Sequence, residues 1–197
     1  MGEYARRCRE PHGPFHDFWL FQEGTRAHAD YQDLLSRKDA PVRMSDDVLQ
    51  YLLECLSSMP TENPACRCEP GVGLNVYGPT VISASGGSML HDALSAWIDQ
   101  FPESLEMVDL EYAASSHGVD AVEGELISRR QGGVPADPWT AGATLSADLA
   151  DCATDGGEVF IEVIRVPRAV LAEQIRTLAE YGRLAAEGTH FVLHVGI

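Results

Sequence analysis

The feature that most constrains the fold is the change of hydrophobic period along residues 158–197. Hydrophobic and polar residues first alternate over Glu158–Val166, which is the period of a β-strand with one buried face. Apolar residues then recur every three or four positions, as on one face of an α-helix, between Pro167 and Gly188, which are suited to a helix start and a helix end. The alternation returns at the end of the chain. We therefore predict a strand, a helix and a strand, with the two strands paired in a parallel or mixed sheet. The helical stripe is Leu171, Ile175, Leu178, Gly182 and Ala185, and the last strand carries Phe191, Leu193, Val195 and Ile197.

Two further helices are predicted upstream. One begins after Ser45, a good N-cap residue, and has Asp46 and Asp47 in the first turn, where they favour the helix dipole. The other follows Gly86-Gly87-Ser88 and ends before Pro102. Each helix has one apolar stripe that should face the core. The stripes are Val48, Leu49, Leu52, Leu56 and Met59 in the first helix, and Leu90, Leu94, Trp97 and Phe101 in the second.

Additional strands are predicted from β-rich or alternating segments. Residues 60–71 contain three prolines and no periodicity, which indicates a loop. Together these elements predict an α+β protein, with a mixed β-sheet and helices packed mainly on one face of it in a single domain. The additional strands are Gly73–Tyr77, Thr80–Ser83, Leu105–Tyr112 and Val122–Leu126.

The N-terminal segment differs from the rest of the chain. Residues 15–21 contain four aromatic side chains, ahead of a polar stretch. We predict that residues 1–44 form an N-terminal aromatic arm or extension and that residues 45–197 form the α+β domain. An aromatic cluster of this kind normally docks on a core, and a partner-binding arm is the alternative.

The charge of the chain limits its partners. Thirty acidic residues against fourteen Lys and Arg give a formal net charge of −16. A polyanion such as a nucleic acid requires a basic surface, and an anionic membrane does too, so we expect neither as a partner. Twelve acids and only one base, Arg67, lie between Glu54 and Glu125. This distribution favours a basic protein partner, and acid that merely promotes solubility is the alternative.

The acidic residues form one recognisable pattern. Asp109 and Glu111 alternate with apolar residues on one predicted strand, and Glu123 and Glu125 do so on the next. Antiparallel pairing would place all four carboxylates on one exposed face, where like charges repel. A surface that tolerates this repulsion is our predicted partner-binding site. A plain solvated face is the alternative.

Metal binding has little support. Cys66-x-Cys68 is a single pair with the wrong spacing for a zinc site, and a second pair is missing. His190 and His194 share a face of the last predicted strand, but solvent-facing or hydrogen-bonded histidines are commoner than strand metal sites. We expect no metal and no cofactor.

A catalytic centre is equally hard to find. Cys68 with His91 or His117 could form a nucleophile and its base, but no third orienting group has a recognisable spacing. Gly71-x-Gly73 lacks the third glycine and the following helix of a nucleotide loop. We therefore expect no enzymatic activity. A small hydrolase or transferase, with a Cys, His or carboxylate site assembled only in the fold, stays open as an alternative.

The expected compartment is a reducing cytoplasm. The five cysteines are odd in number and irregularly spaced, unlike a disulfide scaffold. The first ten residues are polar and arginine-rich, unlike a signal peptide, and no apolar run approaches the roughly 20 residues of a membrane span.

Three segments carry a family resemblance. Gly73–Ile82, the helix around Ala96-Trp97-Ile98 and the closing residues His190–Ile197 together resemble small acidic bacterial proteins of the polymorphic or contact-dependent toxin immunity type, a largely uncharacterised family. The resemblance covers residues 45–197, and its motifs are structural. It implies an immunity or inhibitor protein that binds and occludes a cationic partner, its cognate toxin. A plain interaction module or a homodimer subunit is a further alternative.

Overall fold

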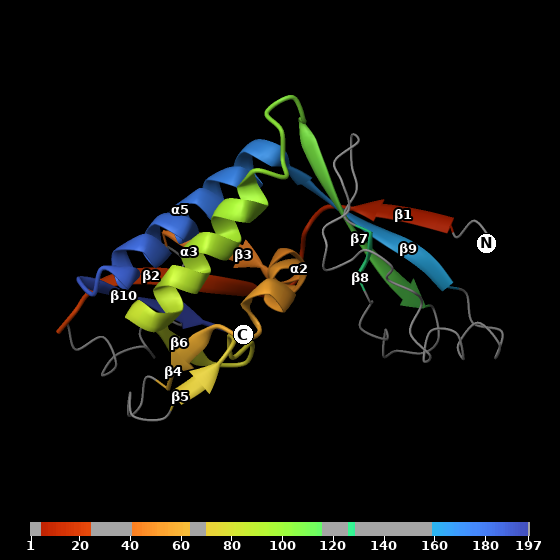
Figure 1. Ribbon diagram of the computed structural model, residues 1–197. Coiled ribbons are helices and arrows are strands. Elements are labelled where there is room, and N and C mark those ends of the chain that lie inside the picture. The colour runs from red at the N-terminus through yellow and green to blue at the C-terminus, as the bar shows by residue number, and fades with distance from the viewer. Residues whose placement is uncertain (1–4, 25–40, 64–69, 116–125, 129–158, 197) are drawn as a thin grey trace. The chain divides into compact units, whose positions relative to one another are not determined.

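The structure is a computed structural model, and it describes residues 5–24, 41–63, 70–115, 126–128 and 159–196. The chain forms two compact units. The first lies within Met1–Pro11 and Gln100–Arg168, and the second within His12–Asp99 and Ala169–Ile197. Strands and helices occur together, and one of the sheets is mixed (Figure 1). The predicted α+β class is therefore confirmed.

The first unit contains a four-stranded sheet in the order β1-β9-β7-β8. β1 runs parallel to β9, whereas β7 is antiparallel to β9 and to β8, so the sheet is mixed. The central strand β9 is rich in β-branched residues, which suit a pleated buried surface. Among them Val163 and Ile164 are both 0% exposed, so this part of β9 is covered on its two faces. The bounds are β1 (Ala5–Arg9), β7 (Met107–Ser115), β8 (Leu126–Ser128) and β9 (Val159–Pro167).

The second unit contains a six-stranded sheet in the order β3-β2-β10-β6-β4-β5. The strand pairs in this sheet are antiparallel. β10 lies near the centre, between β2 and β6, and β5 forms an edge. The bounds are β2 (Phe15–Gln22), β3 (Val42–Ser45), β4 (Pro60–Glu62), β5 (Pro70–Val72), β6 (Pro79–Ile82) and β10 (His190–Val195).

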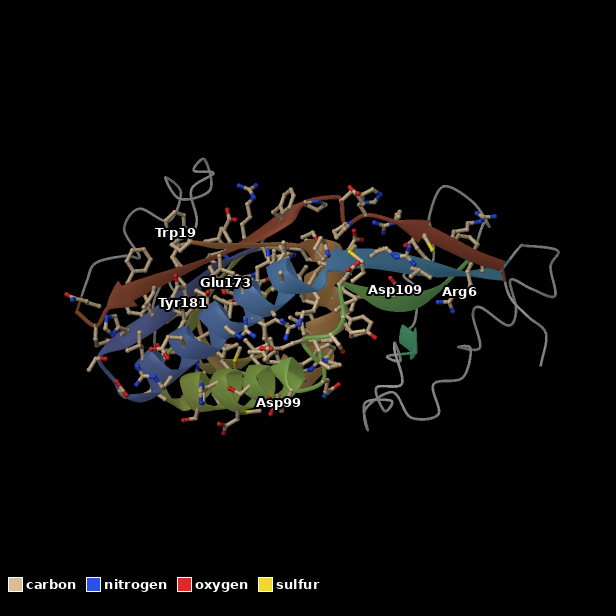
Figure 2. The ribbon with its side chains drawn as sticks, turned by 90° about the horizontal axis from the view of Figure 1, so that it is seen from above. Arg6, Trp19, Asp99, Asp109, Glu173 and Tyr181 are labelled. Carbon is tan, nitrogen blue, oxygen red and sulfur yellow. The ribbon has the colours of Figure 1, made fainter. Side chains whose placement is uncertain are left out.

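In the described part of the chain three helices accompany this sheet, namely α2 (Asp46–Leu56), α3 (Ala84–Ile98) and α5 (Arg168–Ala186). α2 begins directly after Ser45, as predicted, with both expected aspartates in its first turn. α3 and α5 lie side by side (Figures 1 and 2). A Cβ atom added to Gly182 of α5 would lie only 2.7 Å from the backbone nitrogen of His91 in α3. The helices therefore approach closely because a side chain is absent at this crossing.

This crossing yields a prediction for Gly182→Ala. The clashing atoms are backbone atoms of α3, which cannot rotate away. Alanine improves helix propensity by about 1 kcal/mol, but overpacking at the crossing should outweigh this gain and lower the free energy of unfolding by about 1–3 kcal/mol. Chemical denaturation measures the change. Ser88→Ala, at an exposed position of α3, is the control, and equal stability of the two variants would show that the helices can separate freely.

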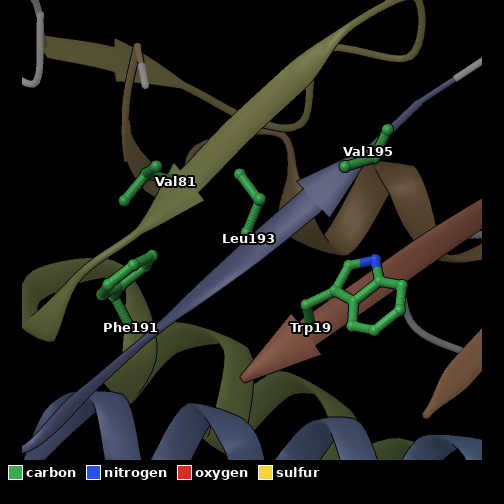
Figure 3. Close-up of a cluster of buried hydrophobic side chains, with 5 residues drawn as sticks. All are labelled: Trp19, Val81, Phe191, Leu193 and Val195. Carbon is green, nitrogen blue, oxygen red and sulfur yellow. The ribbon is translucent and has the colours of Figure 1, made fainter. Parts of the chain in front are cut away.

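The sheet of the second unit is buried on both faces. On one face Trp19, Val81, Phe191, Leu193 and Val195 form a hydrophobic cluster (Figure 3). Phe21 packs against this cluster, and its ring stacks on that of Phe191 with the centroids 5.6 Å apart. Ile82, on the opposite face, is 0% exposed. The methyl group of Ile82 lies 2.8 Å from a Cβ atom built on Gly86, which places α3 against that face.

One predicted pairing is wrong. The strands β9 and β10, which flank α5, belong to different sheets and do not pair with each other. β10 instead pairs with β2 and β6, and β9 with β1 and β7. α5, which separates the two strands in the sequence, belongs to the second unit from Ala169 onwards together with β10, whereas β9 belongs to the first unit.

Local predictions also differ in places. Phe101 was predicted to belong to the apolar stripe of this helix, but α3 ends at Ile98 and Phe101 lies outside it. Residues 60–71, predicted as a loop, contain β4 and the start of β5. The chain turns after β5, where Gly73 has a φ of 70°, a left-handed conformation that favours glycine.

The N-terminal aromatic segment is part of a sheet. β2 contains it and lies between β3 and β10, and Phe18 and Trp19 are 1% and 6% exposed. Phe18 and Trp19 therefore pack in a core, whereas Phe15 is 44% exposed. The expected boundary between residues 44 and 45 falls inside the second unit, at the end of β3.

No helix in the described part of the chain is both long enough and apolar enough to cross a membrane.

Candidate functional site

The predicted acidic face is described only in part. Asp109 lies on β7, directly opposite Arg165 on β9. The Arg165 guanidinium donates two hydrogen bonds to the Asp109 carboxylate, from Nε at 2.8 Å and from Nη2 at 3.1 Å. The side chain of Glu111, and Glu123 and Glu125 altogether, lie outside the described residues. A partner-binding role for these four carboxylates therefore stays a prediction.

Basic side chains accompany this sheet. Arg9 on β1 pairs with Glu162 on β9, with an Nε–Oε1 distance of 2.9 Å, and the Arg7 guanidinium lies 3.9 Å from the ring centroid of Phe160. Arg6 precedes them on β1 (Figure 2). The Arg165 guanidinium compensates the charge of the Asp109 carboxylate. Hydrogen bonding to that carboxylate in turn raises the pKa of Arg165. The described surface of the first unit has mixed charge.

The second unit contains an open pocket of about 560 Å³. It lies where the β4–β5 hairpin meets the segment leading into β6, and residues 61–63, 70–75 and 79–80 line it. These three strands are neighbours at one edge of the sheet (Figure 1). Glu62 is the ionisable residue among the described residues of the lining, and the others are apolar or uncharged polar residues.

Several hydrogen bonds fix the pocket wall. The Thr61 hydroxyl donates to the Gly73 carbonyl at 3.0 Å, and the Asn75 amide donates to the Thr80 hydroxyl at 2.9 Å. The Glu62 carboxylate accepts a short hydrogen bond from the Ser83 hydroxyl. The loop from β5 to β6 is therefore tied both to β4 and to β6.

Large apolar side chains lie exposed at and near this pocket. Val72, the last residue of β5, lines the pocket and is 74% exposed, and Tyr77, in the connection between β5 and β6, is 77% exposed. These are the most exposed large hydrophobic residues in the described part of the chain. Tyrosine is enriched in protein interfaces, so the exposed Tyr77 is a candidate contact residue.

Two buried histidines and a partly exposed aspartate form a chain of polar groups in the second unit. His194 on β10 and His16 on β2 are both 0% exposed, and His194 Nε2 lies 3.0 Å from His16 Nδ1. His16 Nε2 in turn lies 2.9 Å from Oδ1 of Asp46, the first residue of α2. The two imidazole rings are nearly parallel, with an interplanar angle of 12° and a centroid distance of 5.2 Å. Asp46, His16 and His194 therefore form a continuous relay of hydrogen bonds.

Elementary chemistry assigns the protons of this relay when both rings are neutral. A carboxylate accepts, so His16 donates from Nε2, which leaves its Nδ1 as an acceptor. His194 must then donate from Nε2. Its Nδ1 is a buried lone pair with no hydrogen-bond partner among the described residues. Burial is the main reason that the pKa of His194 falls to about 3, and His16 adds to the effect, so His194 is neutral at physiological pH.

Comparisons with protein-family models, curated proteins and solved structures found no match.

The remaining chemical candidates do not come together in the described residues. His190, expected to share a face with His194, lies within hydrogen-bonding distance of the Thr189 hydroxyl, and His91 Nδ1 contacts the Ala179 carbonyl at 3.0 Å. Cys66, Cys68 and His117 lie outside the described residues. Within the described ranges no group of three His, Cys, Asp or Glu side chains could hold a metal ion.

Neither His16 nor Glu62 was predicted as a site residue from the sequence. A weak signal for His16 is its position in phase with Phe18 and Leu20 on an otherwise apolar strand face. No such signal exists for Glu62, because residues 60–71 lack any periodicity.

Proposed function

We propose that this protein is an inhibitor of the immunity type, which binds a basic protein partner and occludes it. The observation that carries the proposal is the formal net charge of −16. Opposite charge accelerates association and disfavours other acidic proteins as partners. The resemblance of residues 45–197 to immunity proteins supports the same function. The pocket with Glu62, and the exposed Val72 beside it, are compatible with a contact surface for a cationic protein.

The Asp46–His16–His194 relay is the observation that favours the alternative, a small hydrolase or transferase. Its connectivity is that of an acid–base relay, because a carboxylate orients one imidazole and that imidazole contacts a second. A general base must reach a substrate proton, however, and both rings are 0% exposed. We therefore prefer a structural role for the relay.

Co-expression with the products of the adjoining genes tests the proposed function. We expect one basic product to co-elute with this protein as a stable complex and to lose its own activity in that complex. The alternative is tested on the same preparations, by assaying the purified protein alone for hydrolysis of ester and amide substrates. Failure of every adjoining product to bind would contradict the inhibitor function.

A further inference from the structure

The hydrogen bonds of the Asp46–His16–His194 relay leave one basic ring nitrogen in it. Both nitrogens of His16 are engaged, because Nε2 lies 2.9 Å from the Asp46 carboxylate and Nδ1 lies 3.0 Å from His194 Nε2. His194 Nδ1 is buried and has no hydrogen-bond partner among the described residues. A proton that enters the two neutral rings therefore binds first at His194 Nδ1, where the lone pair is not in use.

The positive charge is unfavourable on His194 itself. Burial, and then the neighbouring His16, lower the pKa of His194 to about 3. The hydrogen bond between the rings offers a better place for the charge. When Nδ1 of His194 gains a proton, Nε2 of the same ring can pass its own proton to His16 Nδ1, across the 3.0 Å contact. The charge then lies on His16 beside the Asp46 carboxylate, where an opposite charge stabilises it.

We propose that the relay is a proton-sensing device, in which uptake of one proton reverses the hydrogen bond between His16 and His194 and moves the His194 proton from Nε2 to Nδ1. The relay gains one proton in all, and His194 stays neutral. Since Nδ1 makes no hydrogen bond with the described residues, the change breaks none there. The device places a positive charge where the first residue of α2 meets the sheet. It goes beyond the proposed function and gives the relay no catalytic role.

The folded relay therefore accepts one proton, whereas two ordinary histidines of the unfolded chain accept two at low pH. The residues opposite the two rings are uncharged, namely Met44 on β3 and Thr80 on β6. The other titratable or charged groups near the relay, on β2, β3, β10, α3 and the first turn of α2, have contacts of their own or are exposed. They are Asp17 with Arg43, Asp47 with the His12 amide, His190 with Thr189, His91 with the Ala179 carbonyl, and the exposed Asp92.

Nitrogen-15 NMR of the histidine rings in the full-length protein tests the proposal, because the chemical shifts show which ring nitrogen carries a proton. The spectra are recorded from about pH 8 to about pH 4.5, the range in which histidine takes up protons. At the upper limit we expect both rings to carry their proton on Nε2. On acidification we expect His16 to become doubly protonated, while His194 stays singly protonated and its proton moves to Nδ1 with the same midpoint.

Two variants test whether Asp46 supplies the counter-charge. Asp46→Asn keeps an oxygen that can accept from His16 but removes the negative charge, so the midpoint should fall by at least about one pH unit. Asp47→Asn removes the same charge from the same helical turn. This matched control should shift the midpoint far less. Equal shifts in the two variants would contradict the proposed role of Asp46 and overturn the proposal.

The native protein alone also decides the matter, whether or not Asp46→Asn folds. Three results would each overturn the proposal. One is a doubly protonated His194, the second is a His194 proton that stays on Nε2 while His16 titrates, and the third is two rings that stay neutral until the protein unfolds.

Discussion

Replacing Trp97 with alanine should lower the free energy of unfolding by about 3–5 kcal/mol, the range for emptying a large aromatic site in a core. Trp97 is 1% exposed, on the face of α3 that also buries Leu94. Its ring packs edge-on against Tyr51 of α2, with centroids 5.4 Å apart and an interplanar angle of 80°. The substitution therefore removes buried area and the aromatic contact between α2 and α3 at once.

Urea denaturation at neutral pH measures this loss. Tyr77→Ala is the matched control, because it removes another aromatic ring from a position that is 77% exposed. The control should change the free energy of unfolding by less than about 0.5 kcal/mol. If Trp97→Ala cost less than about 1 kcal/mol, α3 would not be anchored through this ring.

Acidification should destabilise the protein through His194. The pKa of His194 is about 3 in the folded protein, below its ordinary value of 6.5. Below pH 6.5 the unfolded chain therefore binds a proton at this residue that the folded protein does not. The contribution of His194 to stability is fully present above pH 6.5 and is lost as the pH falls towards 3, with a limiting slope of about 1.4 kcal/mol per pH unit.

His194→Gln isolates this effect, because a glutamine amide can still donate towards His16 but does not titrate. The free energy of unfolding is measured for both proteins between pH 7 and about pH 4. We expect the native protein to lose stability more steeply than the variant. The comparison is needed because burial raises the pKa of Asp17, whose protonation in the folded protein acts in the opposite direction. Parallel curves would show that the relay accepts a proton without cost.

The local elements could be predicted from the sequence, because helix and strand periods are local properties. Leu90, Leu94 and Trp97 are spaced for one helical face, and all three are buried. The partners of each strand could not be predicted in this way. The alternation in β9 and β10 shows that each strand has a face to bury, but it does not show which strand supplies the neighbouring hydrogen bonds.

The candidate sites were harder to predict, since they join residues that lie far apart in the sequence. His16 and His194 are separated by 178 positions and Asp109 and Arg165 by 56, so no local spacing indicates either contact. The sequence predicted Asp109 as an exposed acid. Only the β7–β9 register shows that Arg165 lies opposite Asp109, where its positive charge compensates the carboxylate.

The most direct test of the proposed inhibitor function is the salt dependence of association with the basic protein that co-elutes. The association rate constant is measured by stopped flow at about 20 mM and about 500 mM NaCl, between which the screening length falls severalfold. An acidic inhibitor of a basic partner should associate at least about tenfold faster at the lower salt concentration. A rate constant that does not change with salt would contradict the claim that opposite charge brings the two proteins together.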